Sequence, residues 1–379
     1  MASKNRPVPE DLIIEILSRL PVKSLIRFTS VCKPWSSIIM SDSFVKKQLS
    51  CPSNKDVYVL FAELYSERSF SLLLYQTFKP EKRMLELTLP YTLYECRPWL
   101  IDSCDGIICL EIEQADDAQA IALWNPALMQ FKVILVKDNK GGLLRASISF
   151  DPITKDYKVV CFIAYVLQCN EKSVDALKVY SLRKGSWRTV GAGDLSRVSK
   201  YNKAFLSYCS SSDGNMVSWV GVSMAGSDCL FLKWMLMSFN VSNETFLETP
   251  MPILPPESDI RSPQYDLTHL ETMRGCSVFG WRSSNPRTMD LWNLREYGNA
   301  RSWTKMLSIT LVPDLLKMFE WSCFFWNGSE LLFVRKLMET TGTQLFLDAY
   351  DPKDRRVRSL GELEATWMVM YKESLVSIK

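Results

Sequence analysis

Apolar residues recur at helical spacing in the first fifty residues and form short, strand-like runs after them. Leu12, Ile16 and Leu20 follow one another at intervals of four residues, which places them on one face of a helix. We expect this helix to begin near Pro9, because proline fits a first turn, where its missing N–H has no partner to lose. Pro21 is expected to end the helix, because proline cannot continue it.

Two more short helices are expected before residue 50. The second begins near Ser24, which can act as an N-cap, and ends at Pro34. Ser41 can cap the third, which carries Phe44 and Val45. Three short helices cannot bury all of their apolar side chains among themselves. We therefore expect part of the surface of this region to bind a partner.

Short apolar runs separated by turn-forming and charged residues fill the chain from residue 56 onward. Typical runs are Val57–Phe61, Ile107–Ile112 and Lys158–Phe162. Runs of this length between Gly, Pro, Asn and Asp indicate a domain built from β-hairpins. The pattern divides the chain into a helical domain, residues 1–50, and a β-rich domain, residues 51–379, so the expected class is mainly β.

A repeat within the β-rich region predicts its architecture. An aromatic residue, a turn-forming residue and a later apolar or aromatic residue recur, beginning at Trp124, Tyr180, Phe239, Trp292 and Tyr350, with Tyr75 as an earlier candidate. The returning residues are Phe131, Trp187, Phe246, Trp303 and Val357. Each unit reads as a strand, a tight turn and a returning strand, with the first aromatic packed between sheets. A repeat of about 55 residues favours a β-propeller of about six blades, with a β-sandwich as the alternative.

Composition and charge exclude several classes of protein. The chain is 47% hydrophobic and 23% charged, as expected of a globular protein, and no run of about 18 apolar residues predicts a membrane span. The net charge of +3 is too small for a strong nucleic-acid footprint. No secretory h-region is apparent at the N-terminus, and the eleven scattered cysteines suit buried, reduced thiols. We expect a cytoplasmic or nuclear protein.

Residues that carry catalytic chemistry are scarce. The single histidine, His269, is expected in a loop or at a strand edge as a structural residue. Cys96, Cys104 and Cys109 do not have the spacing of a zinc site, and no phosphate-binding glycine loop occurs. We expect no cofactor and no metal, and an enzyme on a propeller is the least favoured of the functions considered.

Four N-terminal segments occur in the order of a known motif: Pro9–Leu12, Glu15–Pro21, Lys23–Leu25 and Val31–Trp35. Together they resemble the F-box, with Val8 standing where the family usually has leucine. The resemblance implies docking onto a Skp-family adaptor and, through it, onto a cullin.

The candidate adaptor-binding residues are those at the motif positions: Pro9, Leu12, Ile16, Leu20, Pro21, Ser24, Leu25, Val31, Cys32 and Trp35. Direct contact is expected first from the Leu20-Pro21 and Ser24-Leu25 pairs. The alternative is that Phe28, Cys32 and Trp35 only hold the three helices together.

Segments of the β-rich region also follow a family order: Ser103–Leu110, Trp124–Pro126, Phe150–Val160, Val179–Arg188 and Tyr350–Pro352. Together they resemble the plant F-box-associated domain, which occurs in F-box/kelch-like and S-locus F-box proteins. Asp105 stands where the family commonly has asparagine, and Gly214–Trp219 is a degraded form of another family segment.

The two resemblances imply a substrate-recognition subunit of a Skp-cullin-F-box (SCF) type E3 ubiquitin ligase, itself non-catalytic, that holds a target protein of unknown identity. The alternative is an F-box scaffold protein that does not promote degradation. Four polar stretches are expected to be exposed loops, and propeller loops commonly bind partners: Glu113–Gln119, Cys169–Val174, Gly191–Tyr201 and Pro255–Pro263.

Overall fold

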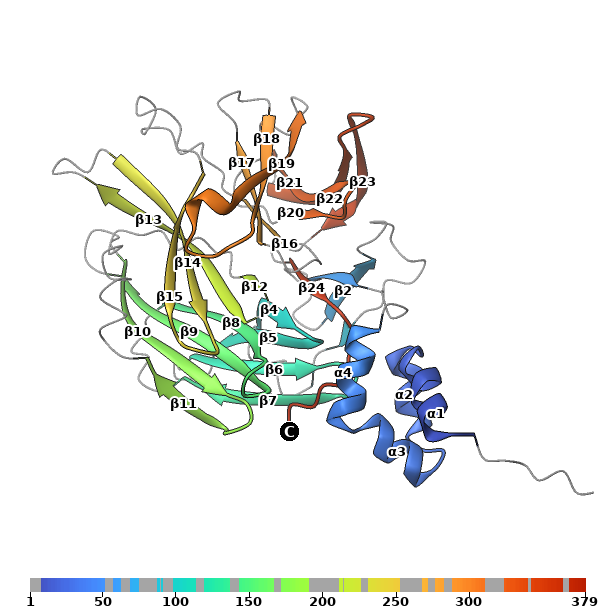
Figure 1. Ribbon diagram of the computed structural model, residues 1–379. Coiled ribbons are helices and arrows are strands. Elements are labelled where there is room, and N and C mark those ends of the chain that lie inside the picture. Colours follow the sequence, from blue (N-terminus) through green and yellow to red (C-terminus); the bar gives the residue numbers. More distant parts are fainter. Residues whose placement is uncertain are drawn as a thin grey trace, which may run out of the picture.

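Helices occupy the N-terminal part of the computed structural model, and strands occupy the rest (Figure 1). The structure describes residues 8–51, 57–62, 69–74, 87–88, 90, 98–113, 119–136, 143–166, 172–190, 211–213, 215–225, 231–252, 268–271, 277–282, 288–310, 324–339, 342–363 and 368–379. None of the helices in these ranges is long and apolar enough to cross a membrane.

Four helices, rather than the three predicted, precede the first strand: α1 (Glu10–Ser18), α2 (Val22–Phe28), α3 (Lys33–Ile39) and α4 (Asp42–Ser50). The prediction was wrong because Pro34 begins a helix instead of breaking one: it lies in the first turn of α3, where proline costs no hydrogen bond. α2 begins directly after Pro21, not near Ser24. Ser41 caps α4 as predicted, since its Oγ accepts a hydrogen bond from the backbone N–H of Phe44 at 3.3 Å.

The strands form six four-stranded units, which we call blades 1 to 6. Blade 1 holds β1 (Tyr58–Ala62), β2 (Ser69–Leu74), β3 (Leu87–Thr88) and β24 (Met368–Tyr371). Blade 2 holds β4 (Trp99–Cys104), β5 (Ile107–Glu113), β6 (Gln119–Asn125) and β7 (Gln130–Leu135); blade 3 holds β8 (Leu143–Asp151), β9 (Asp156–Val166), β10 (Lys172–Ser181) and β11 (Ser186–Thr189). Blade 4 holds β12 (Ser211–Asp213), β13 (Met216–Ala225), β14 (Phe231–Asn240) and β15 (Phe246–Pro250).

Blades 5 and 6 share one eight-stranded sheet, because β16 and β20 pair in parallel. Blade 5 holds β16 (Thr268–Glu271), β17 (Ser277–Arg282), β18 (Thr288–Leu294), the 3-10 helix η3 (Ala300–Ser302) and β19 (Trp303–Thr310). Blade 6 holds β20 (Phe324–Trp326), β21 (Leu331–Glu339), β22 (Gly342–Asp351) and β23 (Arg356–Leu363).

Apolar cores between neighbouring blades close the six units into a ring. Separate clusters of buried residues join blade 1 to 2, 2 to 3, 3 to 4 and 4 to 5. Another joins blade 6 to blade 1, where Leu332 packs with Val59. The last strand, β24, also pairs with β1 in antiparallel register, so the end of the chain completes the first blade. The propeller predicted from the repeat is confirmed.

The repeated aromatic turns lie between the third and fourth strands of their blades. The repeat partners face each other across the hairpin in four of the five units: Trp124 and Phe131, Tyr180 and Trp187, Phe239 and Phe246, Tyr350 and Val357. Blade 5 is the exception. Trp303 faces Leu294, and Trp292 faces Lys305, because η3 lengthens the connection and a bulge follows Leu291. Tyr75 lies outside the described residues.

The predictions for His269 and for one exposed loop were wrong, and the prediction for the buried cysteines was right. His269 lies in β16, which pairs with β17 on one side and β20 on the other, so it is in an interior strand and not in a loop or at a strand edge. Residues 172–174 open β10 instead of forming a loop. The other predicted loop residues, apart from Glu113 and Gln119 at strand ends, lie outside the described ranges. Cys109 and Cys161 are buried, as expected.

Candidate functional site

The four helices pack around a small apolar core. Its fully buried members are Leu17, Val22, Leu25, Ile39, Phe44 and, from the other end of the chain, Leu375. Leu17 faces this core from α1. Ile16 and Leu12, one position and five positions before it, lie on another side of the same helix. The core therefore uses one side of α1 and leaves another side uncovered.

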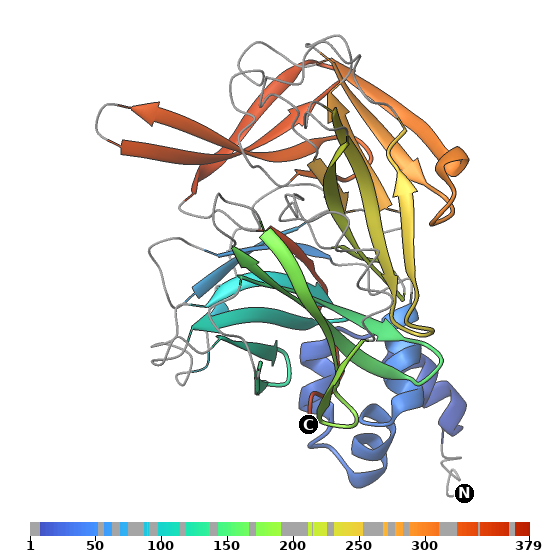
Figure 2. The same cartoon turned by 90° about the vertical axis from the view of Figure 1, so that its left-hand side faces the viewer.

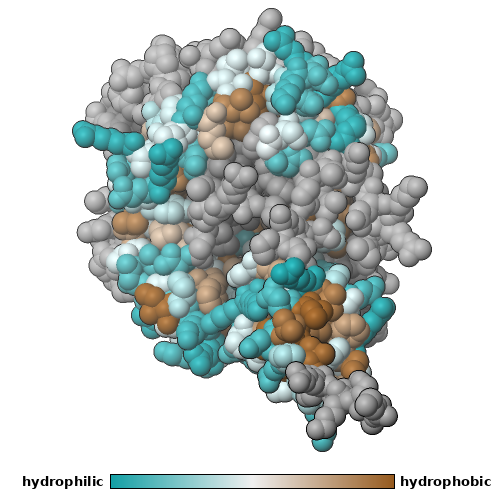
Figure 3. All heavy atoms as spheres, turned by 45° about the vertical axis from the view of Figure 1, so that its right-hand side comes forward, coloured by the Kyte–Doolittle hydropathy of each residue, from teal (hydrophilic) through white to brown (hydrophobic). Residues whose placement is uncertain are grey.

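An apolar surface remains on the uncovered side. Leu12 and Ile16, one turn apart on α1, are 54% and 59% exposed, and Val31 between α2 and α3 is 60% exposed. Figure 3 shows apolar side chains gathered at the helical end of the molecule. Large apolar side chains left exposed in a folded protein commonly mark a site where a partner binds. We call Leu12, Ile16 and Val31 the apolar face.

The other motif residues fall into three groups. Pro9, Pro21 and Cys32 are exposed. Together with the three residues of the apolar face, they make six accessible residues among the ten candidates. Leu20, Ser24 and Trp35 are partly buried. Leu25 is completely buried, so in this arrangement it supports the surface from inside and does not lie on it.

Trp35 packs against Phe28, with ring centroids 5.6 Å apart. This contact agrees with the alternative in which these two aromatic residues hold the helices together. A helical stripe cannot separate the two roles in advance, since the same i, i+4 spacing describes a residue that faces a partner and one that faces a neighbouring helix.

One ion pair links α1 to α4, and a second lies at the end of α1. The carboxylate of Glu15 lies 2.7 Å from Nη2 of Arg19 and 2.8 Å from Nζ of Lys47. Hydrogen bonds from Lys47 first, and then from Arg19, lower the pKa of Glu15 to about 2. Glu15 therefore stays ionised at neutral pH, and its exposed ion pair with Lys47 links α1 to α4.

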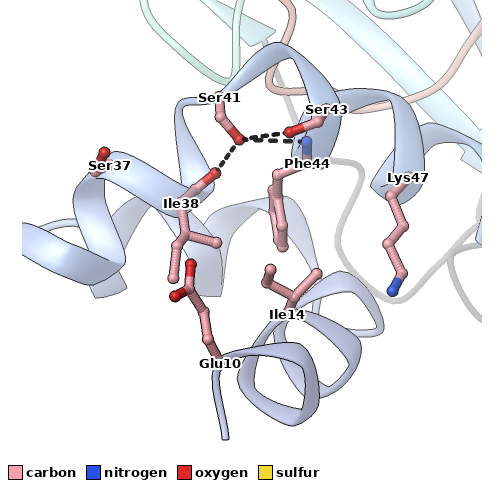
Figure 4. A pocket seen from close by; sticks show the side chains of 8 residues that line it. All are labelled: Glu10, Ile14, Ser37, Ile38, Ser41, Ser43, Phe44 and Lys47. Atoms are coloured by element: carbon pink, nitrogen blue, oxygen red, sulfur yellow. Dashed lines mark hydrogen bonds between the residues drawn. The ribbon is translucent and has the colours of Figure 1, made fainter.

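A hollow of about 340 Å³ lies between α1, α3 and α4 (Figure 4). Ile14, Ile38 and Phe44 form its apolar wall, with Glu10 and Lys47 at its ends. The full lining is Glu10, Ile14, Ser37, Ile38, Ser41, Ser43, Phe44 and Lys47. None of the ten candidate adaptor-binding residues lines it, so the hollow is separate from the apolar face.

Two buried titratable groups of blade 3, Asp151 and Lys158, have structural partners. Nζ of Lys158 lies 2.8 Å from Oδ2 of Asp151 and also donates to the carbonyl of Val241 in the next blade. Burial opposes ionisation of Asp151, but hydrogen bonds from Lys158, Ser242 and others hold its pKa below the ordinary value. These contacts join blade 3 to blade 4.

The buried thiols are not activated nucleophiles. Burial raises the pKa of Cys109 well above its ordinary value, and that of Cys161 in the same direction. Thiols of this kind stay protonated at neutral pH and pack as small apolar groups.

The C-terminal residues joined to the helices were not anticipated from the sequence. Leu375, Val376 and Ile378 are all buried, Leu375 among the helices and the other two in the propeller. Three apolar residues in the last five of the chain were the available signal. Pattern analysis cannot say what such a segment covers, because its contacts lie more than 240 residues away, as between Ser374 and Asn125.

Comparisons with known proteins match both domains. Residues 8–47 match the F-box domain, and residues 57–366 match the F-box associated beta propeller domain. An F-box/kelch-repeat protein of Arabidopsis thaliana is 27% identical over 334 residues, covering 82% of this chain and 81% of that protein. F-box/WD-40 repeat-containing protein 1 of the same plant is 26% identical, covering 81% and 70%.

Solved structures resemble the chain more distantly. The SapL1 lectin in complex with alpha methyl fucoside has a TM-score of 0.42 and 10% sequence identity, covering 82% of this chain and 93% of the lectin. A likeness at this level supports no inference about a ligand. The family match over the propeller spans most of the chain, so the chain belongs to the F-box proteins that carry an F-box associated beta propeller domain.

Proposed function

We propose that this protein is the substrate-recognition subunit of an SCF-type E3 ubiquitin ligase. The observation that carries the proposal is the apolar face of the F-box, which stays exposed while the rest of the helical core is buried and packed against the propeller. A Skp-family adaptor is the partner expected to cover it, and the adaptor binds a cullin in turn. The proposed place of action is the cytoplasm or the nucleus.

The role requires no catalytic residue in this chain. The propeller holds a target protein, and the F-box brings it to the ubiquitin-loaded enzyme carried by the cullin. Rate enhancement comes from effective concentration, since target lysines are held near the transferred ubiquitin. The subunit is therefore non-catalytic, and neither cofactor nor metal takes part in its role.

The first prediction tests the adaptor interface. Ile16→Asp places a charge on the apolar face, where the adaptor would have to desolvate it. We expect the affinity for a Skp-family adaptor to fall by about tenfold or more, the loss typical of a central interface residue. The measurement is titration calorimetry or elution of the complex from a sizing column.

Ile153→Asp is the matched control, because it makes the same substitution at another exposed isoleucine, 73% exposed against 59% for Ile16. It lies in the turn between β8 and β9 and should leave adaptor binding intact. Equal affinities of the two variants would remove the apolar face from the interface. Charging Leu25 is a poorer test, because this buried residue would unfold the helices.

A cellular measurement separates a degradation subunit from a scaffold. Proximity labelling with the Ile16→Asp variant should capture target proteins that are bound but not ubiquitinated. Inhibition of cullin neddylation should then lengthen the half-life of a captured target that the wild-type protein shortens. An unchanged half-life would favour the scaffold function.

A further inference from the structure

The last residues of the chain lie between the helices and the propeller. β24 ends at Tyr371, and residues 372–379 continue without regular secondary structure to a C-terminus near α4 and β7 (Figures 1 and 2). Leu375 is 2% exposed and belongs to the core of the four helices. Val376 and Ile378 are 6% and 1% exposed and belong to the core shared by blades 2 and 3. One short segment is therefore buried in both domains.

Hydrogen bonds hold this segment on both sides. On the propeller side, Nδ2 of Asn125 donates to the carbonyl oxygens of Ser374 at 3.2 Å and Val376 at 2.8 Å. On the helical side, Nζ of Lys372 donates to the carbonyl of Leu49 in α4 at 2.7 Å. The segment thus joins the end of β6 to the end of α4.

Gly106, in the turn between β4 and β5, lies directly against the segment. A Cβ at this position would lie 2.5 Å from Oγ of Ser374 and 2.7 Å from the carbonyl oxygen of Lys372. Its φ of +81° is also a conformation that favours glycine. Glycine at this position leaves the space through which the C-terminal segment passes.

The helices also touch the propeller directly. Val45 and Leu49 of α4 pack against the core of blades 2 and 3, and Ala127 and Leu128 of the turn after β6 pack against the helical core. Leu375 lies in the same cluster as those two turn residues. The C-terminal segment thus extends a contact that consists of one helix and one turn.

We propose that residues 372–379 act as a wedge that holds the F-box and the propeller in one orientation, with Leu375 as the positioning residue on the helical side. Without the wedge the two domains remain folded but change their relative orientation. In a ligase this orientation sets the position of the target relative to the adaptor, a consequence that rests on the proposed function. The wedge itself rests on the contacts above.

The test measures the orientation directly in the full-length protein. Fluorophores for energy transfer are introduced through non-canonical amino acids at Lys23 in α2 and Lys184 in the turn before β11, which are both exposed. The wild-type protein should give one narrow distance distribution. Gly106→Ala pushes the wedge outward, and we expect a broad or two-peaked distribution.

Gly298→Ala is the matched control. Gly298 has a φ of +83°, so alanine there meets the same backbone strain, but its nearest neighbour outside the turn is Cδ2 of Leu247 at 3.6 Å, an ordinary contact. It should leave the distribution narrow. If Gly106→Ala and Gly298→Ala give the same distribution, the wedge is ruled out.

A second variant covers the case in which Gly106→Ala does not fold. Leu375→Ala removes the anchor on the helical side, and hydrogen exchange of the α4 amides should become about tenfold faster or more, while exchange in β13 and β14 stays unchanged. Lys379→Ala, at an exposed position of the same segment, is its control. Unaltered exchange in α4 would overturn the proposal.

Both measurements are made on the free protein and on its complex with a Skp-family adaptor. A chain that binds no adaptor but changes its distance distribution as described supports the wedge and counts against the proposed function. A chain that binds the adaptor but whose distance distribution does not change supports the proposed function and counts against the wedge.

Discussion

Asp102 lies fully buried in β4, where its carboxylate joins blade 2 to blade 3. Oδ2 accepts hydrogen bonds from the hydroxyl of Ser147 and, at 3.1 Å, from the backbone N–H of Ile148, both in β8. Burial is the largest influence and raises the pKa of Asp102 to about 7, although these hydrogen bonds lower it. A carboxyl group in this setting links pH to the stability of the propeller.

The sign of the pH dependence follows from the raised pKa. Between pH values of about 4 and 7 the folded protein holds a proton that the unfolded chain has released, so the free energy of unfolding contributed by Asp102 falls as the pH rises through this window. Asp102→Asn cannot ionise and should lose this dependence. Melting temperatures at pH 5, 6, 7 and 8 are expected to favour the variant over the wild type increasingly toward pH 7. A wild-type-minus-variant difference that is constant with pH would contradict this assignment.

At the scale of elements, Asx residues end the third strands of several blades and shape the hairpins that follow. Oδ1 of Asn125 accepts from the backbone N–H of Ala127, Oδ1 of Asn240 from Ser242, and Oδ1 of Asp351 from Lys353. The turn itself needs only this oxygen, so asparagine and aspartate serve equally well. Blade 2 is different, because Nδ2 of Asn125 also donates to the C-terminal segment.

Asn125→Asp tests that difference. The substitution keeps the oxygen that forms the turn, but it aims a buried carboxylate at the carbonyl oxygens of Ser374 and Val376. We expect a loss of about 3 kcal/mol or more in the free energy of unfolding, the cost of an unpaired buried charge. Denaturant unfolding at pH 8 measures it.

The control is Asn240→Asp, at the same place in blade 4. The Asn240 side chain is partly exposed, and its Oδ1 accepts hydrogen bonds from Nδ2 of Asn215 and from the backbone N–H groups of Ser242 and Asn243. It should change stability by less than about 1 kcal/mol, as surface substitutions commonly do. Similar losses for the two variants would show that the turn, and not the C-terminal segment, needs the amide.

For the whole molecule, the end of the chain has two separable tasks. β24 closes the ring by pairing with β1, and residues 372–379 then reach the helices. A chain ending at Glu373 loses Leu375, Val376 and Ile378 but keeps the closing strand. A chain ending before Met368 loses the strand as well.

We expect the shorter deletion to lower the melting temperature by several degrees while unfolding stays cooperative, because the lost side chains are buried but the sheets are intact. The longer deletion should abolish cooperative unfolding, because β1 loses a neighbour and becomes an unpaired edge. Scanning calorimetry and limited proteolysis distinguish them. Cooperative unfolding of the longer deletion would show that the ring does not depend on β24.

Sequence patterns were most informative where contacts are local. The turn after each third strand is set by neighbouring residues, so Trp124 with Phe131 and Tyr180 with Trp187 could be paired before the structure was known. In blade 5 the two repeat residues are 11 positions apart instead of 7 and do not face each other, because η3 lengthens the connection. The helices failed at Pro34, because proline both ends helices and opens them, and the neighbouring turn decides which.

The sequence by itself determined the division into a helical F-box and a propeller, and the ten motif positions, because periodicity, capping and turn chemistry act over a few residues. Only the tertiary structure decided which motif residues are exposed: Ile16 faces solvent while Leu25 is buried by residues from α1, α3, α4 and the C-terminus. It alone placed Leu375 between the domains. The physical reason is that burial depends on how separate elements pack together, from neighbouring helices around Leu25 to segments hundreds of residues apart around Leu375, and no local pattern encodes that packing.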